Sequence, residues 1–278
     1  MAGRPERRPQ QTHRGRVERV ERLTPHMIRV VLGGEGLAAF ATRGLTDHYI
    51  KIQFPRPGVV YPEPFDPAVI RAELPREDWP MTRTYTVRRW DAETGELTVD
   101  FVHHGDEGVA GPWAAQAQPG DEIHFGGPGG GYAPSPDADW HLLVGDESAL
   151  PAIAAALEQL PEGARAHVFV EVAGPEEEQK LPTPAEAEIT WLHRGEGRIG
   201  EALVGAVSGL DFPAGLPEAF VHGEAGFVKE LRRLLRVERG IPMDRLSISG
   251  YWRTGQDEDG WQSTKREWNR SVEEEQGN

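Results

Sequence analysis

The residue types best suited to chemistry in this chain stand together in the hexapeptide from Arg83 to Arg88, which reads Arg-Thr-Tyr-Thr-Val-Arg. If this segment is a strand, alternation places Tyr85 and Val87 on one face and the two threonines on the other. An aromatic ring, hydroxyl groups and fixed cations are what a tricyclic flavin with a pyrophosphate tail needs beside it. The hexapeptide therefore indicates a flavin site, whereas periodicity alone favours an exposed strand with ordinary arginines.

A second group of residues combines a strand end with a glycine-rich turn. The segment from Asp100 to Gly105 reads Asp-Phe-Val-His-His-Gly, and the segment from Gly108 to Trp113 reads Gly-Val-Ala-Gly-Pro-Trp. Glycine-rich backbone that leads into a short helix offers free N–H groups, which suit a diphosphate. The neighbouring His103 and His104 point to opposite faces of a strand, so they indicate a strand end and no resident metal.

Two further turns have the pattern of a strand that ends where a helix begins. The first reads Gly-Asp-Glu-Ser-Ala-Leu-Pro after an apolar run, and the second reads His-Gly-Glu-Ala-Gly from His222. In a dinucleotide-binding fold the ligand lies at such helix N-termini, although the three-glycine fingerprint is absent here. The predicted nucleotide contacts are Gly145, Asp146, Glu147, Ser148, Ala149, Leu150, Pro151, Gly223, Glu224 and Ala225.

The choice between NADH and NADPH depends on one carboxylate. Glu171 lies near the end of an expected strand, where a carboxylate accepts a hydrogen bond from a ribose 2′-hydroxyl and repels a 2′-phosphate. This position favours NADH, but Lys180 in the following loop is a cation that could oppose the effect. The sequence leaves the choice open.

The elements that must position these residues change in kind along the chain. From Arg14 to about Gly127, short β-like runs separated by turn residues predict an antiparallel six-stranded barrel. The segment from Pro55 to Pro80 holds seven prolines and is expected to form a long surface loop between two strands. The expected strands are Gly15–Arg22, Met27–Leu32, Tyr49–Phe54, Thr84–Trp90, Leu97–His103 and Glu122–Phe125.

After Asp137 the rhythm becomes strand, helix, strand, which predicts an α/β domain with a doubly wound parallel sheet. A terminal helix is expected to dock Trp261 and Trp268, with a disordered end after it. The predicted organisation is a disordered arm over 1–13, the barrel over 14–130, the α/β domain over 138–253 and the helix and tail over 254–278.

Composition excludes several classes of protein. The formal net charge of −15 argues against a nucleic-acid partner, and the absence of cysteine excludes disulfides, thiolate metal sites and cysteine-ligated clusters. No apolar run approaches the roughly 20 residues that a membrane-spanning helix needs, and the first residues do not form a secretory signal. The default expectations are a monomer, no membrane contact and a cytoplasmic location.

In this order, the motifs that begin at Arg83, Asp100, Gly108 and Gly145, with Pro-Gly-Asp at 119–121, resemble the siderophore-interacting protein family. That family belongs to the ferredoxin-reductase-like flavoproteins, and the resemblance runs from about Arg14 to Trp261. It implies an N-terminal FAD-binding barrel and a C-terminal domain that presents NADH or NADPH.

The resemblance also implies a role for each matching residue. Tyr85 and Thr86 lie against the isoalloxazine, Arg83 and Arg88 neutralise the phosphates, and the turn beginning at Gly108 meets the diphosphate. The full set assigned to FAD is Arg83, Tyr85, Thr86, Val87, Arg88, Asp100, Val102, His104, Gly108, Ala110, Gly111 and Trp113.

Four residues complete the implied site. Lys51 and Arg253 match family positions and are candidates for a basic rim that attracts an anionic iron chelate within about 8 Å, the screening length at physiological salt. Trp252 is expected either to contact flavin or substrate or only to cap the sheet. His222 departs from the family pattern, which often has Cys or Ala there, so its role stays open.

The implied activity is ferric-siderophore reduction, in which NAD(P)H delivers a hydride to FAD and single electrons then reduce chelated Fe(III) for iron uptake. The alternatives are a general flavin reductase with another acceptor and a redox-silent siderophore-binding protein. A ferredoxin-like protein is the alternative electron donor. The sequence does not name the siderophore.

Overall fold

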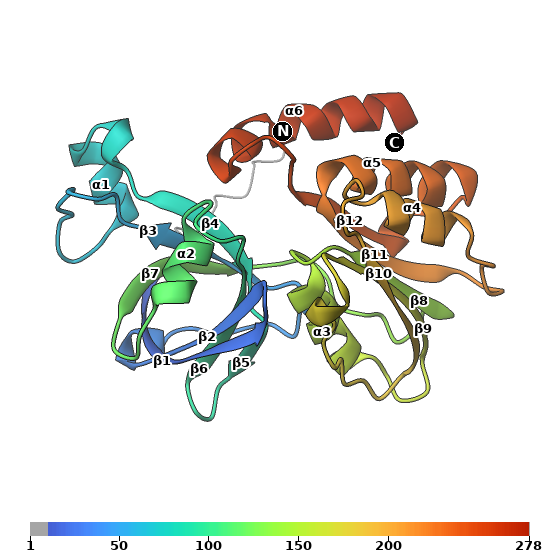
Figure 1. Ribbon diagram of the computed structural model, residues 1–278, viewed down its shortest axis with the longest axis horizontal. Coiled ribbons are helices and arrows are strands. Elements are labelled where there is room, and N and C mark those ends of the chain that lie inside the picture. Colours follow the sequence, from blue (N-terminus) through green and yellow to red (C-terminus); the bar gives the residue numbers. More distant parts are fainter. Residues whose placement is uncertain (1–10, 278) are drawn as a thin grey trace, which may run out of the picture.

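The computed structural model describes residues 11–277, and their strands form two sheets that stand side by side (Figure 1). The N-terminal sheet has seven strands in the order β4-β3-β7-β1-β2-β6-β5, and neighbouring strands run antiparallel. Buried β-branched and aromatic residues favour this arrangement, because they pack well on a pleated surface. The strands are β1 (Thr12–Thr24), β2 (Met27–Gly33), β3 (Tyr49–Phe54), β4 (Met81–Thr86), β5 (Arg89–Asp91), β6 (Glu96–Val102) and β7 (Glu122–Gly129).

The expected strand Thr84–Trp90 is in fact two strands, so the sheet has seven strands and not the predicted six. The Val87 N–H donates to the His48 carbonyl at 2.6 Å, whereas the Arg88 N–H donates to the Thr98 carbonyl at 2.9 Å in β6. Because β4 and β5 are the two edges of the sheet, this two-residue crossing brings the edges together and closes a barrel.

The interior of the barrel is filled from alternate positions of its strands. In β6, for example, Leu97, Val99 and Phe101 are all fully buried, as a period of two requires when one face of a strand meets the core. The same alternation along β3 brings Ile50 and Ile52 into this core.

The prediction of an irregular loop for Pro55 to Pro80 is correct only in part. The segment leaves the sheet after β3 and returns at β4, but it contains helix α1 (Pro67–Glu73) and a short 3-10 turn over Arg76–Asp78. Asp66 begins α1, because its carboxylate accepts the Ala68 N–H at 2.7 Å and a proline occupies the first helical position.

The C-terminal sheet has five parallel strands in the order β10-β9-β8-β11-β12. The chain runs outward from β8 through β9 to β10 and then returns to the other side of β8. The sheet is therefore doubly wound, as predicted, and its switch point lies between β8 and β11, where such folds bind ligands. The strands are β8 (Trp140–Gly145), β9 (Arg165–Val172), β10 (Glu186–His193), β11 (Pro217–Glu224) and β12 (Leu246–Trp252).

Helices cover both faces of this sheet. Helix α3 (Leu150–Gln159) packs on the face that includes Phe220, whereas α4 (Glu201–Ser208) and α5 (Ala225–Arg233) pack on the face that includes Val221. A π-helical turn over Leu234–Glu238 extends α5. The strands are apolar on both faces, as buried parallel strands are.

The C-terminal helix α6 (Glu258–Gln276) extends from the barrel to α5, along the top of the molecule in Figure 1. Trp261 docks as expected, with 1% of its surface exposed and its ring edge-on to Trp268. The expected disordered end is wrong, because the helix continues to Gln276, whose side chain bonds to Arg232 and to the Lys229 carbonyl.

The last residues of the arm expected over 1–13 belong instead to a strand. Strand β1 begins at Thr12, and the side chain of His13 is buried against Phe40 and Phe125. Residues 1–10 lie outside the described part of the chain. Within residues 11–277, no helix combines the length and the apolar character that crossing a membrane requires.

Candidate cofactor and nucleotide site

On the barrel side, Tyr85 and Thr86 occupy the end of β4, at the edge of the sheet. The ring of Tyr85 packs on Phe101 with centroids 4.4 Å apart, and Phe101 in turn contacts Trp113 of α2 (Ala110–Gln116) at 5.5 Å. Burial raises the pKa of the Tyr85 phenol, so the ring stays neutral. This packing fixes the half-buried ring of Tyr85 at the edge of the barrel, and the neighbouring Thr86 and Val87 are buried.

The glycine-rich turn and the helix after it approach the end of β6. A Cβ on Gly111 would lie 2.9 Å from the Val102 carbonyl oxygen, so only glycine allows α2 to approach β6 so closely. Gly108 has a φ of +76°, which also favours glycine. The N–H groups of Ala110 and Gly111 stand in the first turn of α2, where no intrahelical acceptor exists, and no side chain caps this end of the helix. These donors fit an anionic diphosphate such as that of FAD.

The structure does not bring the two arginines of the hexapeptide together. Arg83 donates to the Thr82 carbonyl at 2.7 Å and lies 3.5 Å from Asp259 of α6. Arg88, beyond the crossing, points to the other domain and forms a two-bond ion pair with Glu158 of α3.

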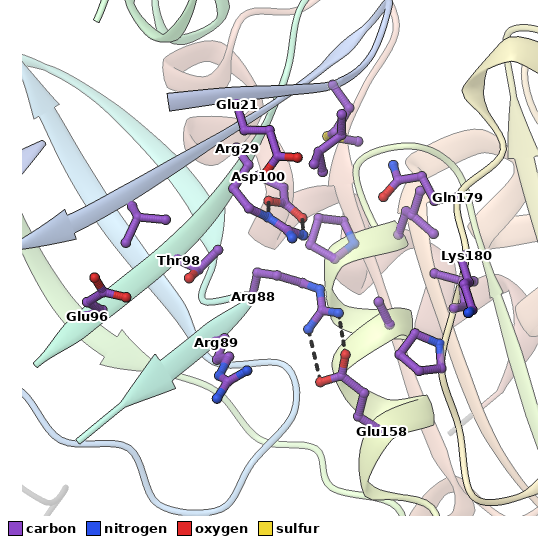
Figure 2. Close-up of a pocket in the computed structure, with 18 of the residues that line it drawn as sticks. Glu21, Arg29, Arg88, Arg89, Glu96, Thr98, Asp100, Glu158, Gln179 and Lys180 are labelled. Carbon is purple, nitrogen blue, oxygen red and sulfur yellow. Dashed lines mark hydrogen bonds and ion pairs between the residues drawn. The ribbon is translucent and has the colours of Figure 1, made fainter. Parts of the chain in front are cut away.

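Arg88 and Asp100 instead line a groove of about 940 Å³ between the domains (Figure 2). Asp100 is bound by Arg29 through bonds of 2.7 and 2.8 Å, and Glu158 neutralises Arg88. Each charge therefore already has a partner. Arg83 is the member of the pair that remains next to Tyr85 on β4, with the exposed Asp259 as its ion-pair partner.

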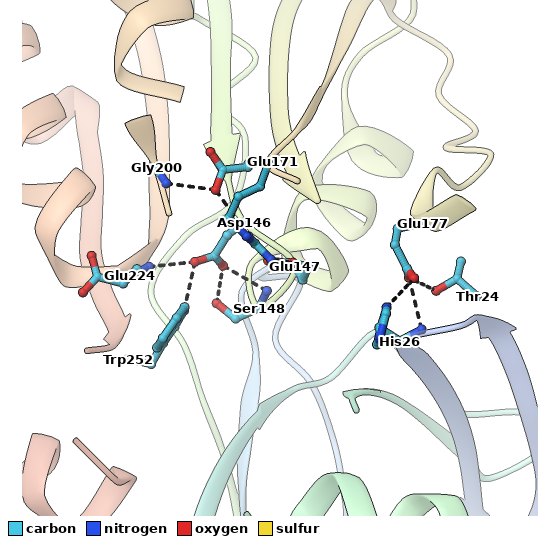
Figure 3. Close-up of polar contacts among 11 residues, drawn as sticks. Thr24, His26, Asp146, Glu147, Ser148, Glu171, Glu177, Gly200, Glu224 and Trp252 are labelled. Atoms are coloured by element: carbon cyan, nitrogen blue, oxygen red, sulfur yellow. Dashed lines mark hydrogen bonds and ion pairs between the residues drawn. The ribbon is translucent and has the colours of Figure 1, made fainter. Parts of the chain in front are cut away.

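The two nucleotide turns meet at the switch point through Asp146, which is fully buried (Figure 3). Its carboxylate accepts bonds from the N–H and hydroxyl of Ser148, from the Glu224 N–H at 2.8 Å and from the Trp252 indole N–H at 2.9 Å. Burial and then the charge of Glu147 raise the pKa of Asp146 to about 6. One carboxylate thus joins the end of β8, the end of β11 and the end of β12.

Glycines allow these turns to approach one another. A Cβ on Gly145 would lie 2.8 Å from the His222 carbonyl oxygen, and one on Gly223, with φ +140°, would lie 2.6 Å from Asp146. Glu224 begins α5 by accepting the Gly226 N–H. The remaining members of the turns have buried side chains, so only their backbone is available to a ligand; they are Ala149, Leu150, Pro151 and Ala225.

Glu147 and Glu171 share one cation that the sequence motifs did not identify. Arg194, directly after β10, donates to Glu147 at 2.5 Å and to Glu171 at 3.3 Å. Glu171 is fully buried and also accepts the Gly200 N–H at 2.9 Å. The structure therefore does not present Glu171 as an exposed acceptor for a ribose hydroxyl, because its side chain is fully buried and one of its oxygens holds the turn before α4.

A second unpredicted group joins the domains near His104. Glu177, in a turn after β9, accepts bonds from the Thr24 hydroxyl, from the His26 N–H and from the His26 ring at 2.6 Å (Figure 3). The His26 ring lies 6.0 Å from that of His104, and burial lowers the pKa of His104. Both rings therefore lie where the β6 strand end faces the nucleotide domain.

The predicted rim residues come from one strand of each domain. Lys51 stands on β3 opposite Thr84 of β4, and Trp252 is held by Asp146 at the end of β12, with Arg253 next in sequence. Thr84 is also bound by α6, because the Glu258 carboxylate accepts both its N–H and its hydroxyl. No local motif indicated Glu258, whereas Arg194 could have been found from its place at a strand's carboxyl end.

A barrel with a flavin-type strand and glycine turn, joined to a doubly wound domain with a nucleotide switch point, defines an FAD-dependent oxidoreductase that uses a nicotinamide nucleotide. Ferredoxin reductases at 16% and 11% identity share the fold, with TM-scores of 0.63 and 0.61.

Two family models match this chain: the siderophore-interacting FAD-binding domain over residues 16–132 and the siderophore-interacting protein over residues 138–255. The chain belongs to the siderophore-interacting protein family.

Three relatives illustrate the match. Ferric vibriobactin reductase ViuB of Vibrio cholerae is 34% identical over 86% of this chain and 88% of its own. The NADPH-dependent ferric-chelate reductase of Escherichia coli is 35% identical over 85% of this chain and 91% of its own. The crystal structure of a siderophore utilization protein from T. fusca is 40% identical, with a TM-score of 0.78, over 91% of this chain and 96% of its own.

Proposed function

We propose that this protein is a ferric-siderophore reductase that takes a hydride from NADH or NADPH and reduces chelated Fe(III) to Fe(II). The observation that supports the proposal is the presence of one half-site in each of two domains that Arg88 and Glu158 join: the Tyr85–Thr86 strand end of the barrel and the turns that Asp146 joins in the nucleotide domain. Two relatives are named as reductases of ferric chelates, which supports the choice of electron acceptor.

The residues of the barrel bind and orient the cofactor in this proposal. FAD, when bound, accepts two electrons as a hydride and releases them one at a time. Tyr85 and Thr86 set the plane of the ring, and Arg83 with the N–H groups of Ala110 and Gly111 neutralises the phosphates. Val102 and His104 flank the rest of the nucleotide. Arg88 and Asp100, already paired elsewhere, hold the domains and the barrel wall in place.

The nucleotide domain positions the electron donor. The turns at Gly145 and Gly223 present backbone at the switch point, and Asp146 keeps them in register with Trp252. Arg194 offsets the charge of Glu147 and Glu171, which would otherwise repel a dinucleotide. We propose direct use of a nicotinamide by a single chain in the cytoplasm, with a ferredoxin-like donor as the other source of electrons.

Iron is the substrate and needs no protein ligand here. Hard oxygen chelators hold Fe(II) less firmly than Fe(III), so one-electron reduction releases the metal. The protein has to bring the chelate within reach of the ring and to match its charge.

The test is an anaerobic titration of the purified flavoprotein. NADH or NADPH is expected to bleach the flavin absorbance, and a ferric siderophore is expected to restore it while an Fe(II)-specific dye gains colour. Reoxidation by other acceptors, without any by ferric chelates, would make the protein a general flavin reductase. A folded protein that takes up no FAD would contradict any redox role and leave only siderophore binding.

A further inference from the structure

The first turn of helix α6 places two carboxylates on the barrel strand that carries the flavin motif. The Glu258 carboxylate accepts the Thr84 N–H at 2.9 Å and the Thr84 hydroxyl at 2.5 Å. The next residue, Asp259, has a carboxylate oxygen 3.5 Å from the Arg83 guanidinium. A helix that follows the nucleotide domain in the sequence therefore forms an ion pair with an arginine of the barrel.

Arg83 is the more buried member of this ion pair. Its side chain is 16% exposed, whereas that of Asp259 is 59% exposed. Within residues 11–277, the other partner of the guanidinium is the neutral Thr82 carbonyl, at 2.7 Å. A cation that is largely removed from water is costly unless an anion accompanies it. Arg83 therefore calls for one anion, and Asp259 supplies it.

Arg83 also lies on the face of β4 that is assigned to the cofactor. Alternation along the strand puts Arg83 and Tyr85 on the same face. Tyr85 packs on Phe101, which contacts Trp113 of α2, so this face is turned toward α2. In the proposed function, Arg83 neutralises the phosphates of FAD on this face. The diphosphate and the Asp259 carboxylate are thus two anions that call on one guanidinium.

The position of Asp259 is fixed on both sides along the chain. Before it, the Thr254 N–H donates to Glu224 of the second nucleotide turn at 3.2 Å. After it, Trp261 is 1% exposed. A carboxylate that is held in this way acts as an intramolecular ligand, so its effective concentration beside Arg83 is high.

We propose that Asp259 forms an autoinhibitory contact, in which it competes with the diphosphate of FAD for Arg83. This inference rests on the assignment of Arg83 to the FAD phosphates in the proposed function. Binding of FAD breaks the ion pair and returns the carboxylate to solvent, so α6 lowers the affinity for FAD and allows the cofactor to exchange. The family model ends at residue 255, so Asp259 belongs to a helix that this model does not include.

The two carboxylates of this turn have different roles. Glu258 accepts two bonds from Thr84, which is a neutral partner on the edge strand, and this contact keeps α6 docked. In the part of the chain that the structure describes, Arg83 is the ion-pair partner of Asp259. Loss of the Asp259 contact therefore leaves the helix in place and changes only the environment of Arg83.

The experiment measures FAD binding to the full chain from which flavin has been removed. FAD is added stepwise, and the quenching of tryptophan fluorescence gives the Kd. We expect Asp259→Asn to lower the Kd of FAD by about threefold, which is the scale of an exposed ion pair. The matched control is Glu267→Gln, which removes the same charge from an exposed position about 12 Å further along α6 and should leave the Kd nearly unchanged.

A double-mutant cycle with Arg83→Gln decides whether the competition is for Arg83. Arg83→Gln alone is expected to weaken FAD binding, and Asp259→Asn is expected to have a much smaller effect in that background. Tightening by the same factor in both backgrounds, or in neither, would overturn the inference, as would faster hydrogen exchange over residues 81–86 in Asp259→Asn. If Arg83→Gln leaves the Kd unchanged, the assignment of Arg83 in the proposed function fails first, so the two failures are distinguishable.

Discussion

At the residue scale, His222 shows how a histidine in the site is kept uncharged. Its Nε2 lies 3.0 Å from the Ser247 hydroxyl, and its ring stacks on Phe220 at 4.0 Å and contacts Tyr251 at 4.8 Å. Burial and then the charge of Lys265 lower the pKa of His222 to about 3. The imidazole is therefore neutral at physiological pH, and it packs as an aromatic member of the sheet surface.

This pKa predicts how stability depends on pH. The unfolded histidine takes up a proton below its ordinary pKa of 6.5, whereas the folded one does so only near 3. The contribution of His222 to stability is thus complete above 6.5 and is lost as the pH falls toward 3. Relative to His222→Gln, the parent should lose about 2 kcal/mol of unfolding free energy between pH about 7 and about 5, measured by urea denaturation.

The comparison with a variant is needed because Asp146 acts in the opposite direction. Its folded pKa of about 6 lies above its ordinary 3.8, so its contribution to stability is lost as the pH rises through this window. Asp146 is present in both proteins and cancels in the difference. Parallel pH profiles for parent and variant would show that His222 is protonated in the fold.

The sequence analysis found the residues of the two nucleotide turns, but it missed the distant residues that bind to the site. Asp146 belongs to a motif that is continuous in the chain, so its place at a strand end could be predicted. Arg194 and Glu177 act on residues 47 and 151 positions away, and local patterns contain no information on such distances. The same lack of local information explains why Glu171 was misinterpreted: its strand was predicted, but its bond to Gly200 was not.

At the scale of elements, the break between β4 and β5 was missed for a comparable reason. The residues from Thr84 to Trp90 all suit a strand, and only their pairing partners change, from β3 to β6. Most other strands and helices were predicted because they alternate or repeat within a few residues. Helix α6 is longer than expected since its last turn is held by α5, a contact that no helix pattern reveals.

The contact of α6 with the barrel gives a prediction for that element. In Glu258→Ala the Thr84 N–H loses its acceptor, so we expect this amide to exchange with solvent about tenfold faster. The measurement is hydrogen exchange followed by mass spectrometry over residues 81–86. Asp259→Ala, which removes only an exposed carboxylate 3.5 Å from Arg83, should leave the exchange rate nearly unchanged. Equal protection in both variants would mean that α6 does not cover the strand.

At the scale of the whole molecule, polar contacts between residues that are distant in the sequence join the domains. Glu177 binds the β1–β2 turn, Glu158 binds Arg88, and Glu258 binds Thr84. The sequence rhythm predicted two domains of these kinds, but their relative placement depends on these contacts between distant residues. The two folds were therefore predictable, whereas the placement of the candidate residues of one domain against those of the other was not.

Glu177 provides a test of how firmly the domains are coupled. Its carboxylate is 4% exposed and accepts three bonds from the other domain, so Glu177→Ala should cost about 3 kcal/mol and weaken the interface. We expect the calorimetric unfolding peak of the parent to separate into two peaks. Glu178→Ala is the control, because that carboxylate binds His193 within its own domain. An unsplit peak in Glu177→Ala would show that the other contacts suffice.

The crossing at Val87 and Arg88 has a mechanical consequence. Arg88 is tied to α3 of the nucleotide domain, and Tyr85 stands only three residues before it, a span of about 10 Å of extended chain. No slack loop lies between them to absorb a displacement. A movement of the nucleotide domain relative to the barrel would therefore displace the backbone at Tyr85, and the ring of Tyr85 would move with it.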